Sequence, residues 1–399
     1  MDRPTGPLQG VRIIDLSAVV SGPFGTSILA DQGADVIMVE QAHQPDLIRA
    51  SGPLAASAQG VSAPFNSINR NKRSITLNLK HDDGKALLKR LVAEADVVVQ
   101  NFRPGALDRL GVGWDELRRV NPELIMCSIS GFGSDGPYSH RPAFDPVVQC
   151  ISGYPVVQGA GGRPTLMGTI VCDKVTSLNV AQAICAALVA RANGHGGQHI
   201  ELAMVDASIH FLWPEAMWNH TYLDHDIEMP ELTSLYRLFP TIDGWALVYS
   251  VSTDPQWQGM CRAFGRPDLA TDPRFVDLQA RTRHSVEMND EIEKETGRYT
   301  TDELVRLMDS HDVPVAPVNT RQAVIDDPHV RHRNIVVESE HPTAGRLRSV
   351  RPPALFSATP AQLRLPAPTF GQHTDEVLQS LLCLDDEAIA ALRADGVIA

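Results

Sequence analysis

A single carboxylate, Asp173, stands in the segment LMGTIVCDKVTSLNVAQAICAALVA (166–190), whose other residues apart from Lys174 are uncharged. From Val175 onward, apolar residues recur at spacings of three and four, which predicts a helix buried along one face. Aspartate is a common helix N-cap, because its side chain accepts hydrogen bonds from free N–H groups of the first turn. A cap therefore accounts for Asp173, and a chemical role needs support from the rest of the chain.

Basic residues gather in the segment NRNKRS (69–74), which holds Arg70, Lys72 and Arg73 in a protein of net charge −13. Such a cluster is often a solvated face. The alternative is a phosphate site, since ammonium and guanidinium groups bind phosphate and attract a phosphate-rich ligand against the overall negative field. Three further cations follow in neighbouring predicted elements: Lys80, Arg103 and Arg109.

Several other catalytic signatures are absent from the sequence. The turn after the first predicted strand holds Gly22 and Gly25 but no GxGxxG, although Glu40 stands where a ribose-binding acid is expected. The sequence contains no GxSxG of a hydrolase, no HExxH and no paired CxxC. His195 and His199 lie in the glycine-rich segment NGHGGQH, and we interpret both as surface histidines.

Short apolar segments alternate with helical ones over the first third of the chain. Strands are predicted at 11–16, 34–40, 74–79, 96–102 and 124–130, with helices at 22–33 and 84–95. This alternation predicts an α/β fold with a parallel, Rossmann-like sheet and helices on both faces. Ligands of such sheets bind beyond the carboxyl ends of the strands, so the loops after Leu16, Glu40, Asn101 and Ser130 are expected to hold the site.

A second, smaller domain is expected, because 399 residues exceed what one core normally organises. After Pro230 the pattern changes. Residues 236–250 are typical of a hairpin around Asp243-Gly244, and residues 254–312 are charged and helical. Residues 313–318 begin another extended segment, and a last helix pair follows His373.

Composition narrows the partners and the compartment. The net charge of −13 disfavours nucleic acid or an anionic membrane as the main partner. The six cysteines are scattered, which is typical of buried thiols in a reducing cytosol. The N-terminus has no apolar targeting core and no run of 18 or more apolar residues occurs, so we expect a cytoplasmic protein.

Several segments together resemble the class III CoA-transferases, the family of formyl-CoA and carnitine CoA-transferases, and their relatives the α-methylacyl-CoA racemases. The similar segments are PLQGVRIIDLSAVVSGPFGTSILADQGADVIMVE, NRNKRSITLNLK, QNFRPGALDRLGVGWDELRRVNPELI, SGFGSDGPY, the helix opening at Asp173, GQHIELAMVDA and GQHTDEVL. The resemblance implies a large Rossmann-like CoA-binding domain from residues 1–225, a small α+β domain from 226–325, and a return to the large domain over 326–399. It also implies an interlaced homodimer.

By the same resemblance, Asp173 is the nucleophile. Its carboxylate attacks the thioester of an acyl-CoA, which gives an acyl-aspartyl anhydride and CoA thiolate. The thiolate then forms an aspartyl-CoA thioester and frees the donor acid, and an acceptor acid repeats the steps in reverse. A helix N-terminus is expected to keep Asp173 ionised at pH 7, so that cap and nucleophile are compatible roles.

The resemblance further implies where CoA, which serves as a substrate, is bound. No metal is expected. An arginine that contacts the nucleotide in formyl-CoA transferase is Gln41 here, so Arg70, Lys72 or Arg73 is expected to hold that end. Arg141 is expected near the approach to the active site. The other implied CoA contacts are Val20, Ser21, Leu77, Lys80, Asn101, Phe102, Arg103 and Arg109.

Departures from the family bear on the substrate. Val20 replaces an active-site glutamine of formyl-CoA transferase, and no tetraglycine loop occurs between 225 and 260, so formate and oxalate are not expected as substrates. The racemases carry a histidine at the position of Phe144, ahead of Asp145, and a phenyl ring cannot move a proton. Phe144 and Asp145 are therefore expected to line a transferase pocket. An epimerase and a non-catalytic acyl-CoA-binding protein are the alternatives.

Overall fold

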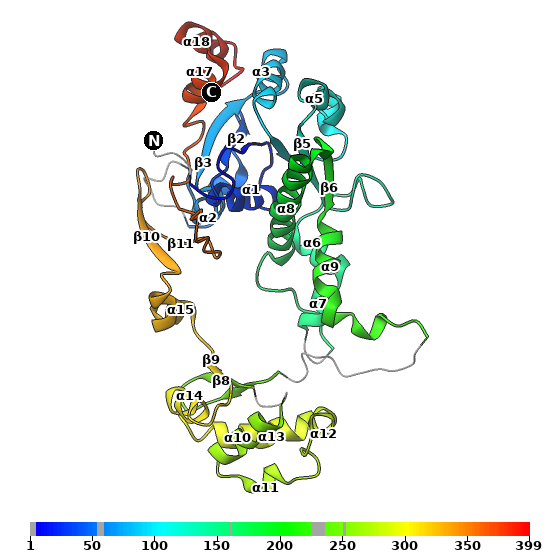
Figure 1. The fold of residues 1–399 in the computed structure, drawn as a ribbon, viewed down its shortest axis with the longest axis vertical. Helices are drawn as coiled ribbons and strands as arrows, with labels where there is room; N and C mark the ends of the chain where they lie inside the picture. Colours follow the sequence, from blue (N-terminus) through cyan, green and yellow to red (C-terminus); the bar gives the residue numbers. More distant parts are fainter. Residues whose placement is uncertain (1–4, 54–59, 160–161, 225–235, 250–252) are drawn as a thin grey trace. The chain divides into compact units, whose positions relative to one another are not determined.

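The chain folds into two units in this computed structural model, which describes residues 5–53, 60–159, 162–224, 236–249 and 253–399. The first unit comprises Met1–Leu212 and Arg333–Ala399, and the second comprises Trp213–His332. The chain thus leaves the first unit and returns to it (Figure 1). The boundary expected at residue 225 lies outside the described residues, and the one expected at 325 falls within a helix of the second unit.

A six-stranded parallel sheet is the centre of the first unit, in the order β3-β2-β1-β4-β5-β6. The strands are β1 (Arg12–Asp15), β2 (Asp35–Gln41), β3 (Lys72–Leu77), β4 (Val97–Gln100), β5 (Ile125–Ser130) and β6 (His199–Ala203). The Rossmann-like prediction is confirmed, and its five strands match β1 to β5. The order reverses between β1 and β4, and in such sheets ligands bind at this switch point.

Helices cover both faces of the sheet, because its strands are apolar on both sides. Ile14 and Ile37 face a core shared with α3, α5 and α17, whereas their neighbours Ile13 and Val36 are equally buried on the other face. On that other face α1 and α8 pack against each other and the sheet. These helices are α1 (Ser21–Asp31), α3 (Asp82–Ala93), α5 (Trp114–Val120), α8 (Val171–Ala190) and α17 (Thr374–Leu382).

Both ends of the chain build the same core. Val377 and Ile389, from the last two helices, are buried in one cluster with Leu87 of α3 and Ile75 of β3. The returning chain first forms an antiparallel hairpin and ends in a helix. Further elements of this unit are α2 (Ala63–Asn69), α4 (Ala106–Leu110), α6 (Asp145–Ser152), α7 (Tyr154–Gln158), α9 (Met204–Ala216), β10 (Val336–His341), β11 (Gly345–Val350) and α18 (Asp386–Ala394).

The second unit combines a small antiparallel sheet with helices around the buried Trp257. Its first hairpin turns at the expected Asp243-Gly244, and the extended segment predicted from residue 313 supplies the third strand. The elements are β7 (Leu238–Pro240), β8 (Trp245–Val248), β9 (Val315–Pro317), α10 (Asp254–Ala263), α11 (Pro267–Ala270), α12 (Leu278–Arg283), α13 (Ser285–Thr296), α14 (Thr301–Asp309), α15 (Arg321–Asp326) and α16 (Pro328–His332).

One helical stretch in the described part of the chain, Val171–His195, is long and apolar enough to cross a membrane by length and composition alone. Helix α8 forms most of it and packs against α1, β5 and β6. Its outer side is apolar as well, since Leu178 and Val189 are 55% and 61% exposed. Contacts within the unit therefore account for one side of the helix, and the described residues do not cover the apolar side chains on the other.

Candidate active site

Asp173 lies in the first turn of α8, but it is not the cap. The cap position is Ile170, and the carboxylate of Asp145 takes over the capping role from 28 residues away: Asp145 Oδ2 accepts the N–H groups of Cys172 (2.7 Å) and Asp173 (3.1 Å). The prediction that Asp173 caps the helix is therefore wrong. No hydrogen bond or ion pair to the Asp173 carboxylate is found in the described ranges.

Asp145 is itself held rigidly at the start of α6. It is 3% exposed, and Gln149 Nε2 donates to its Oδ1 over 2.6 Å. The Gln149 amide also contacts the backbone that leads into α8, through Met167 N–H (3.0 Å) and the Thr169 carbonyl (3.2 Å). Two carboxylates thus meet at the start of α8: Asp145 is bonded on both oxygens, and Asp173 has no partner among the residues that the structure describes.

The pKa of Asp173 is raised to about 7, first by burial and then by the negative charge of Asp145. We expected the helix N-terminus to keep this group fully ionised at pH 7, and that expectation is wrong. The first N–H groups of α8 already bind Asp145, so the favourable end of the helix is directed at the other carboxylate. Near neutral pH both forms of Asp173 are populated.

The loop between β1 and α1 lies within one helical turn of Asp173. Ser177 Oγ donates to the carbonyl of Ser21 and to the carbonyl of Asp173, each over 2.8 Å. The Val20 side chain is buried in an apolar cluster with Met38 and Phe65, so a contact from this residue to a ligand comes from its backbone. The structure thus places Ser21 against the first turns of α8, which carries the candidate nucleophile.

The basic segment 69–74 is neither a solvated face nor an open phosphate site. Lys72 has no exposed surface, and its ammonium donates to Asp15 (3.0 Å), Asn69 (2.8 Å) and the Pro23 carbonyl (2.8 Å). Burial lowers the pKa of Lys72, and the Asp15 carboxylate opposes that shift. A cation enclosed in this way cannot reach a ligand.

Arg70 and Arg73 are used in the same manner. Arg70 pairs with Asp31 of α1 over 2.7 Å and is 8% exposed, while Arg73 pairs with Asp35 of β2 over 2.7 Å. These pairs tie β3 to its neighbours, so the expectation that segment 69–74 holds the nucleotide is not supported by its geometry. Leu77 is also fully buried, which leaves only its backbone for a ligand.

Four other cations are exposed along the carboxyl edge of the sheet: Lys80 after β3, Arg103 after β4, Arg109 in α4 and Arg141 after β5. Arg141 stacks over the ring of Tyr138 at 3.8 Å. None of the four is paired with a carboxylate in the portion of the chain that the structure describes. In a protein of net charge −13, these four side chains are positive charges available to an anionic ligand.

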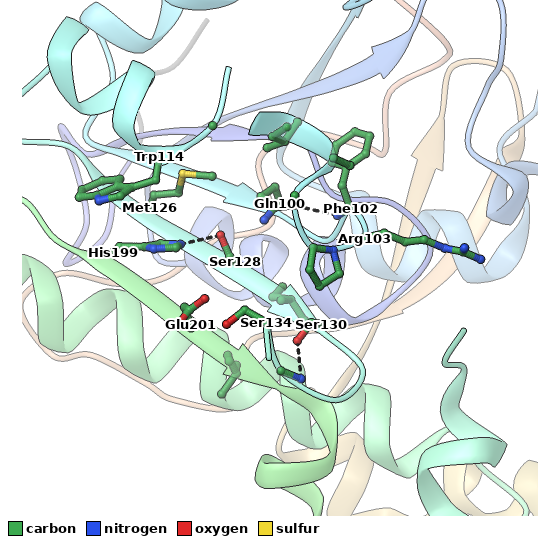
Figure 2. Close-up of a pocket in the computed structure, with 18 of the residues that line it drawn as sticks. Gln100, Phe102, Arg103, Trp114, Met126, Ser128, Ser130, Ser134, His199 and Glu201 are labelled. Atoms are coloured by element: carbon green, nitrogen blue, oxygen red, sulfur yellow. Dashed lines mark hydrogen bonds between the residues drawn. The ribbon is translucent and has the colours of Figure 1, made fainter. Parts of the chain in front are cut away.

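A cavity of about 280 Å³ opens beside the loop after β4 and is lined by Phe102, Arg103 and polar residues of β5 and β6. Figure 2 shows Ser128 and His199 facing each other, with Trp114 against the histidine ring and Arg103 extending in another direction. The Ser128 Oγ to His199 Nε2 distance is 2.8 Å. His199 belongs to a strand that the sequence did not predict and is half-buried between Ser128 and Trp114, so its interpretation as a scattered surface histidine is wrong, whereas His195 is exposed as expected.

Asn101 has a structural duty next to this cavity. Its side-chain amide accepts the Ala18 N–H (2.9 Å) and donates to the Ala18 carbonyl (2.7 Å), so it fixes the β1–α1 loop. At the end of the neighbouring strand, the Glu40 carboxylate forms a buried ion pair with the Arg49 guanidinium over 2.6 Å. Glu40 is therefore not available to bind a ribose. Gln41 contacts Asn78 over 3.3 Å.

Phe144 immediately precedes α6 and is 62% exposed, so its ring is available to line a pocket. Asp145 is buried and instead binds the N–H groups at the start of α8, next to the candidate nucleophile. Within the described residues, no group of three or more His, Cys, Asp or Glu side chains is arranged to hold a metal ion. The arrangement offers a largely buried carboxylate, Asp173, that has no hydrogen-bond partner among the described residues, together with exposed cations and loop backbone. Such a set suits covalent chemistry on a phosphate-bearing substrate.

Comparison with known proteins agrees with this arrangement. Residues 8–374 match the family described as CoA-transferase family III. The chain is 34% identical to the succinyl-CoA:D-citramalate CoA-transferase of Chloroflexus aurantiacus, over 99% of each chain, and 36% identical to the succinate–glutarate CoA-transferase of Agrobacterium fabrum, over 96% and 97%. A CaiB/BaiF family protein from Brucella suis superposes with a TM-score of 0.82 at 31% identity, covering 94% of this chain and all of its own. The chain belongs to CoA-transferase family III.

Proposed function

We propose that the protein moves CoA from an acyl-CoA donor to a carboxylic acid acceptor, with Asp173 as the covalent nucleophile. The observation that carries the proposal is the Asp173 carboxylate at the start of α8, which has no partner in the described part of the chain, while a second carboxylate binds the helix N–H groups in its place. A carboxylate with only a structural role is normally hydrogen-bonded when it is partly buried.

The reaction proceeds through two covalent states of Asp173. The ionised carboxylate attacks the thioester carbonyl, the C–S bond breaks, and CoA leaves as a thiolate with an acyl-aspartyl anhydride left behind. The thiolate then attacks the aspartyl carbonyl and expels the donor as its carboxylate. An acceptor carboxylate attacks the aspartyl-CoA thioester and the same steps run in reverse, so no net proton is consumed.

For CoA binding we propose the four exposed cations Lys80, Arg103, Arg109 and Arg141, which suit its phosphate groups. The backbone of Val20, Ser21 and Leu77 and the ring of Phe102 complete the proposed site. Asn101 contributes by holding the loop at Ala18. Arg70, Lys72 and Arg73 are excluded from the proposal, because their side chains are held in ion pairs.

For the acids we propose molecules larger than formate or oxalate. Val20 presents a buried methyl-bearing side chain where formyl-CoA transferase has a glutamine, so the polar group that would contact a very small acid is missing. The similar transferases named for succinyl-CoA, citramalate and glutarate support dicarboxylic acids of this larger kind as the first candidates.

We further propose that the enzyme is a homodimer. Large apolar side chains on several helices of the first unit are solvent-exposed in the single chain, and exposed apolar surface of this kind can mark an interface. They are Val147, Ile151, Val156, Leu178, Val189 and Phe211. A second copy that covers them would make the stability depend on protein concentration. A mass of one chain by light scattering at micromolar concentration contradicts this proposal.

The test of the function is label exchange between an acyl-CoA and a free acid. The protein is incubated with a panel of acyl-CoAs, trapped with hydroxylamine, and digested, and the peptide that holds Asp173 is examined by mass spectrometry. We expect an aspartyl hydroxamate at Asp173 with one class of acyl-CoA and none in Asp173→Asn. Full exchange activity in Asp173→Asn would refute the proposed nucleophile.

The epimerase alternative predicts a different label. Such an enzyme incorporates solvent deuterium at the α-carbon of the acyl group, through a base on each side of that carbon. Phe144 supplies no such base. Deuterium incorporation without CoA exchange would therefore overturn the transferase proposal, and tight CoA binding with neither reaction would favour a binding protein.

A further inference from the structure

The β1–α1 loop contains a residue in an unfavourable conformation. Val19 has a φ of 69°, in the left-handed region that a β-branched side chain rarely adopts. It directly precedes Val20 and Ser21, and the Ser21 carbonyl is bonded to Ser177, one helical turn after the candidate nucleophile in α8. A conformation of this kind persists only where the surroundings enforce it.

Asp46, in the segment after the neighbouring strand β2, supplies that enforcement. Its Oδ2 accepts the N–H of Val19 over 2.9 Å, and its Oδ1 accepts the N–H of Ile48 over 3.1 Å. Asp46 is fixed in turn, because its own N–H donates to Glu40 over 3.3 Å and Glu40 is held by the buried Arg49. Burial raises the pKa of Asp46, and the two backbone N–H groups oppose that shift.

Asn101 holds the adjacent residue from the other direction, through both backbone groups of Ala18. The next fixed point along the loop is the Ser21 carbonyl, which Ser177 ties to the backbone of Asp173. Helix α1 begins at Ser21, and no side chain in the described ranges caps it. The loop therefore leads into the uncapped N-terminus of α1, which lies against the first turns of α8 that carry Asp173. The conformation of Val19 sets the direction in which the chain enters α1.

We propose that Asp46 is a positioning residue of the transferase: it holds Val19 in the left-handed conformation so that the Val20–Ser21 backbone is presented to the acyl-CoA next to Asp173. This inference rests on the proposed function. It differs from a purely structural role, in which Asp46 would serve only to cap the short turn Leu47–Ala50 through Ile48.

The two roles separate in a pair of substitutions. Asp46→Ala removes both hydrogen bonds, and Val19→Gly removes the steric penalty of a positive φ without restoring the bond to Ile48. If Asp46 acts through Val19, the double variant Val19→Gly/Asp46→Ala recovers activity that Asp46→Ala has lost. If Asp46 acts only through the turn at 47–50, the glycine recovers nothing.

The experiment uses the full-length chain and measures kcat and KM for label exchange with an active acyl-CoA, together with backbone hydrogen exchange of the peptide covering 16–24. We expect Asp46→Ala to lower kcat/KM at least tenfold and to speed hydrogen exchange in this peptide. We expect the double variant to recover at least a third of that loss, measured on the logarithm of kcat/KM. Asp277→Ala, which loses a comparable 2.8 Å bond to the Ala280 N–H in the second unit, is the control and keeps wild-type kinetics.

Kinetics of Asp46→Ala within twofold of the wild type would overturn the inference, and so would a loss of activity that the glycine leaves unchanged. Should Asp46→Ala fail to fold, Asp46→Asn takes its place, because the amide keeps only one of the two acceptors. A wild-type protein without exchange activity on any acyl-CoA contradicts the proposed function instead. In that event unchanged hydrogen exchange of peptide 16–24 in the variant still contradicts the role of Asp46.

Discussion

Two charged regions of the same unit contrast sharply. Around Lys72 the ammonium, the Asp15 carboxylate and the surrounding polar atoms satisfy one another, and the group is fully buried. Around Asp173 the carboxylate has no partner within the described residues, and its pKa is raised to about 7. The first region holds neighbouring elements together, whereas the second keeps a reactive group available. Charge that is already paired stabilises the fold, and charge left unpaired can do chemistry.

The strongest way to test this contrast is to remove the unpaired carboxylate. Asp173→Asn is expected to lower CoA exchange by about 10³-fold or more, because the covalent route is lost. The folded state binds this proton more tightly than the unfolded chain, so the ionised carboxylate lowers the free energy of unfolding as pH rises through about 7. The variant should therefore be at least as stable as the wild type at pH 8, by thermal unfolding. A clear loss of stability at that pH would place Asp173 among the structural charges.

Removing a paired charge should do the opposite. Lys72→Met leaves Asp15 buried without its partner, and such a change costs about 3–5 kcal/mol of unfolding free energy. Urea unfolding measures this loss. The double variant Lys72→Met/Asp15→Asn removes both charges and should recover part of it. Unaltered stability together with weakened CoA binding would show that Lys72 is a ligand after all.

The interaction between the two carboxylates can be read from the pH dependence of the rate. Protonated Asp173 cannot attack, so the exchange rate should fall as the pH drops below about 7. Asp145→Asn removes the negative charge that raises this pKa, and the acid limb of the profile should move to lower pH. Rates between pH 5.5 and 8.5, each normalised to its own plateau, separate this shift from a general loss. If the acid limb of the Asp145→Asn profile does not move, burial alone raises the pKa of Asp173.

The smallest expected effects concern the exposed cations. Arg103→Ala should raise the KM for acyl-CoA by about tenfold, with a steeper penalty at low salt, because one charge-assisted contact to phosphate is lost. Its melting temperature should be unchanged, since the side chain is exposed and unpaired within the described residues. Arg73→Ala is the matched control and should show the reverse, a lower melting temperature and an unchanged KM. If both substitutions raise the KM equally, the proposed difference between paired structural charges and ligand-binding charges is wrong.

The sequence predicted the strands of the sheet well, because buried parallel strands are short apolar runs with clear breaks between them. It missed β6, since His199–Ala203 follows a glycine-rich segment and alternates polar with apolar residues at the edge of the sheet. The hairpin at Asp243-Gly244 was predicted from its turn residues alone. Most of the strands and the hairpin could therefore be predicted from local hydrophobic periodicity and from the residue types at turns.

The site was less accessible to sequence reasoning, because its contacts are long-range. The cap of α8 comes from Asp145, and nothing local at Asp173 indicates that the helix N–H groups are already occupied. Lys72 begins a strand, and nothing in the neighbouring sequence indicates that its side chain pairs with Asp15, which lies 57 residues earlier. Resemblance pointed to Asp173, and only the three-dimensional arrangement separated paired from unpaired charges.

The shared core of the two chain ends has a consequence for how the protein is made. Once the segment up to Leu212 has been synthesised, all six strands are present, but the sheet face that packs against Val377, Leu378 and Ile389 is still uncovered. That apolar surface stays open to water, chaperones and neighbouring nascent chains until the final helices emerge. The core on this face can therefore close only after α17 and α18 have been synthesised.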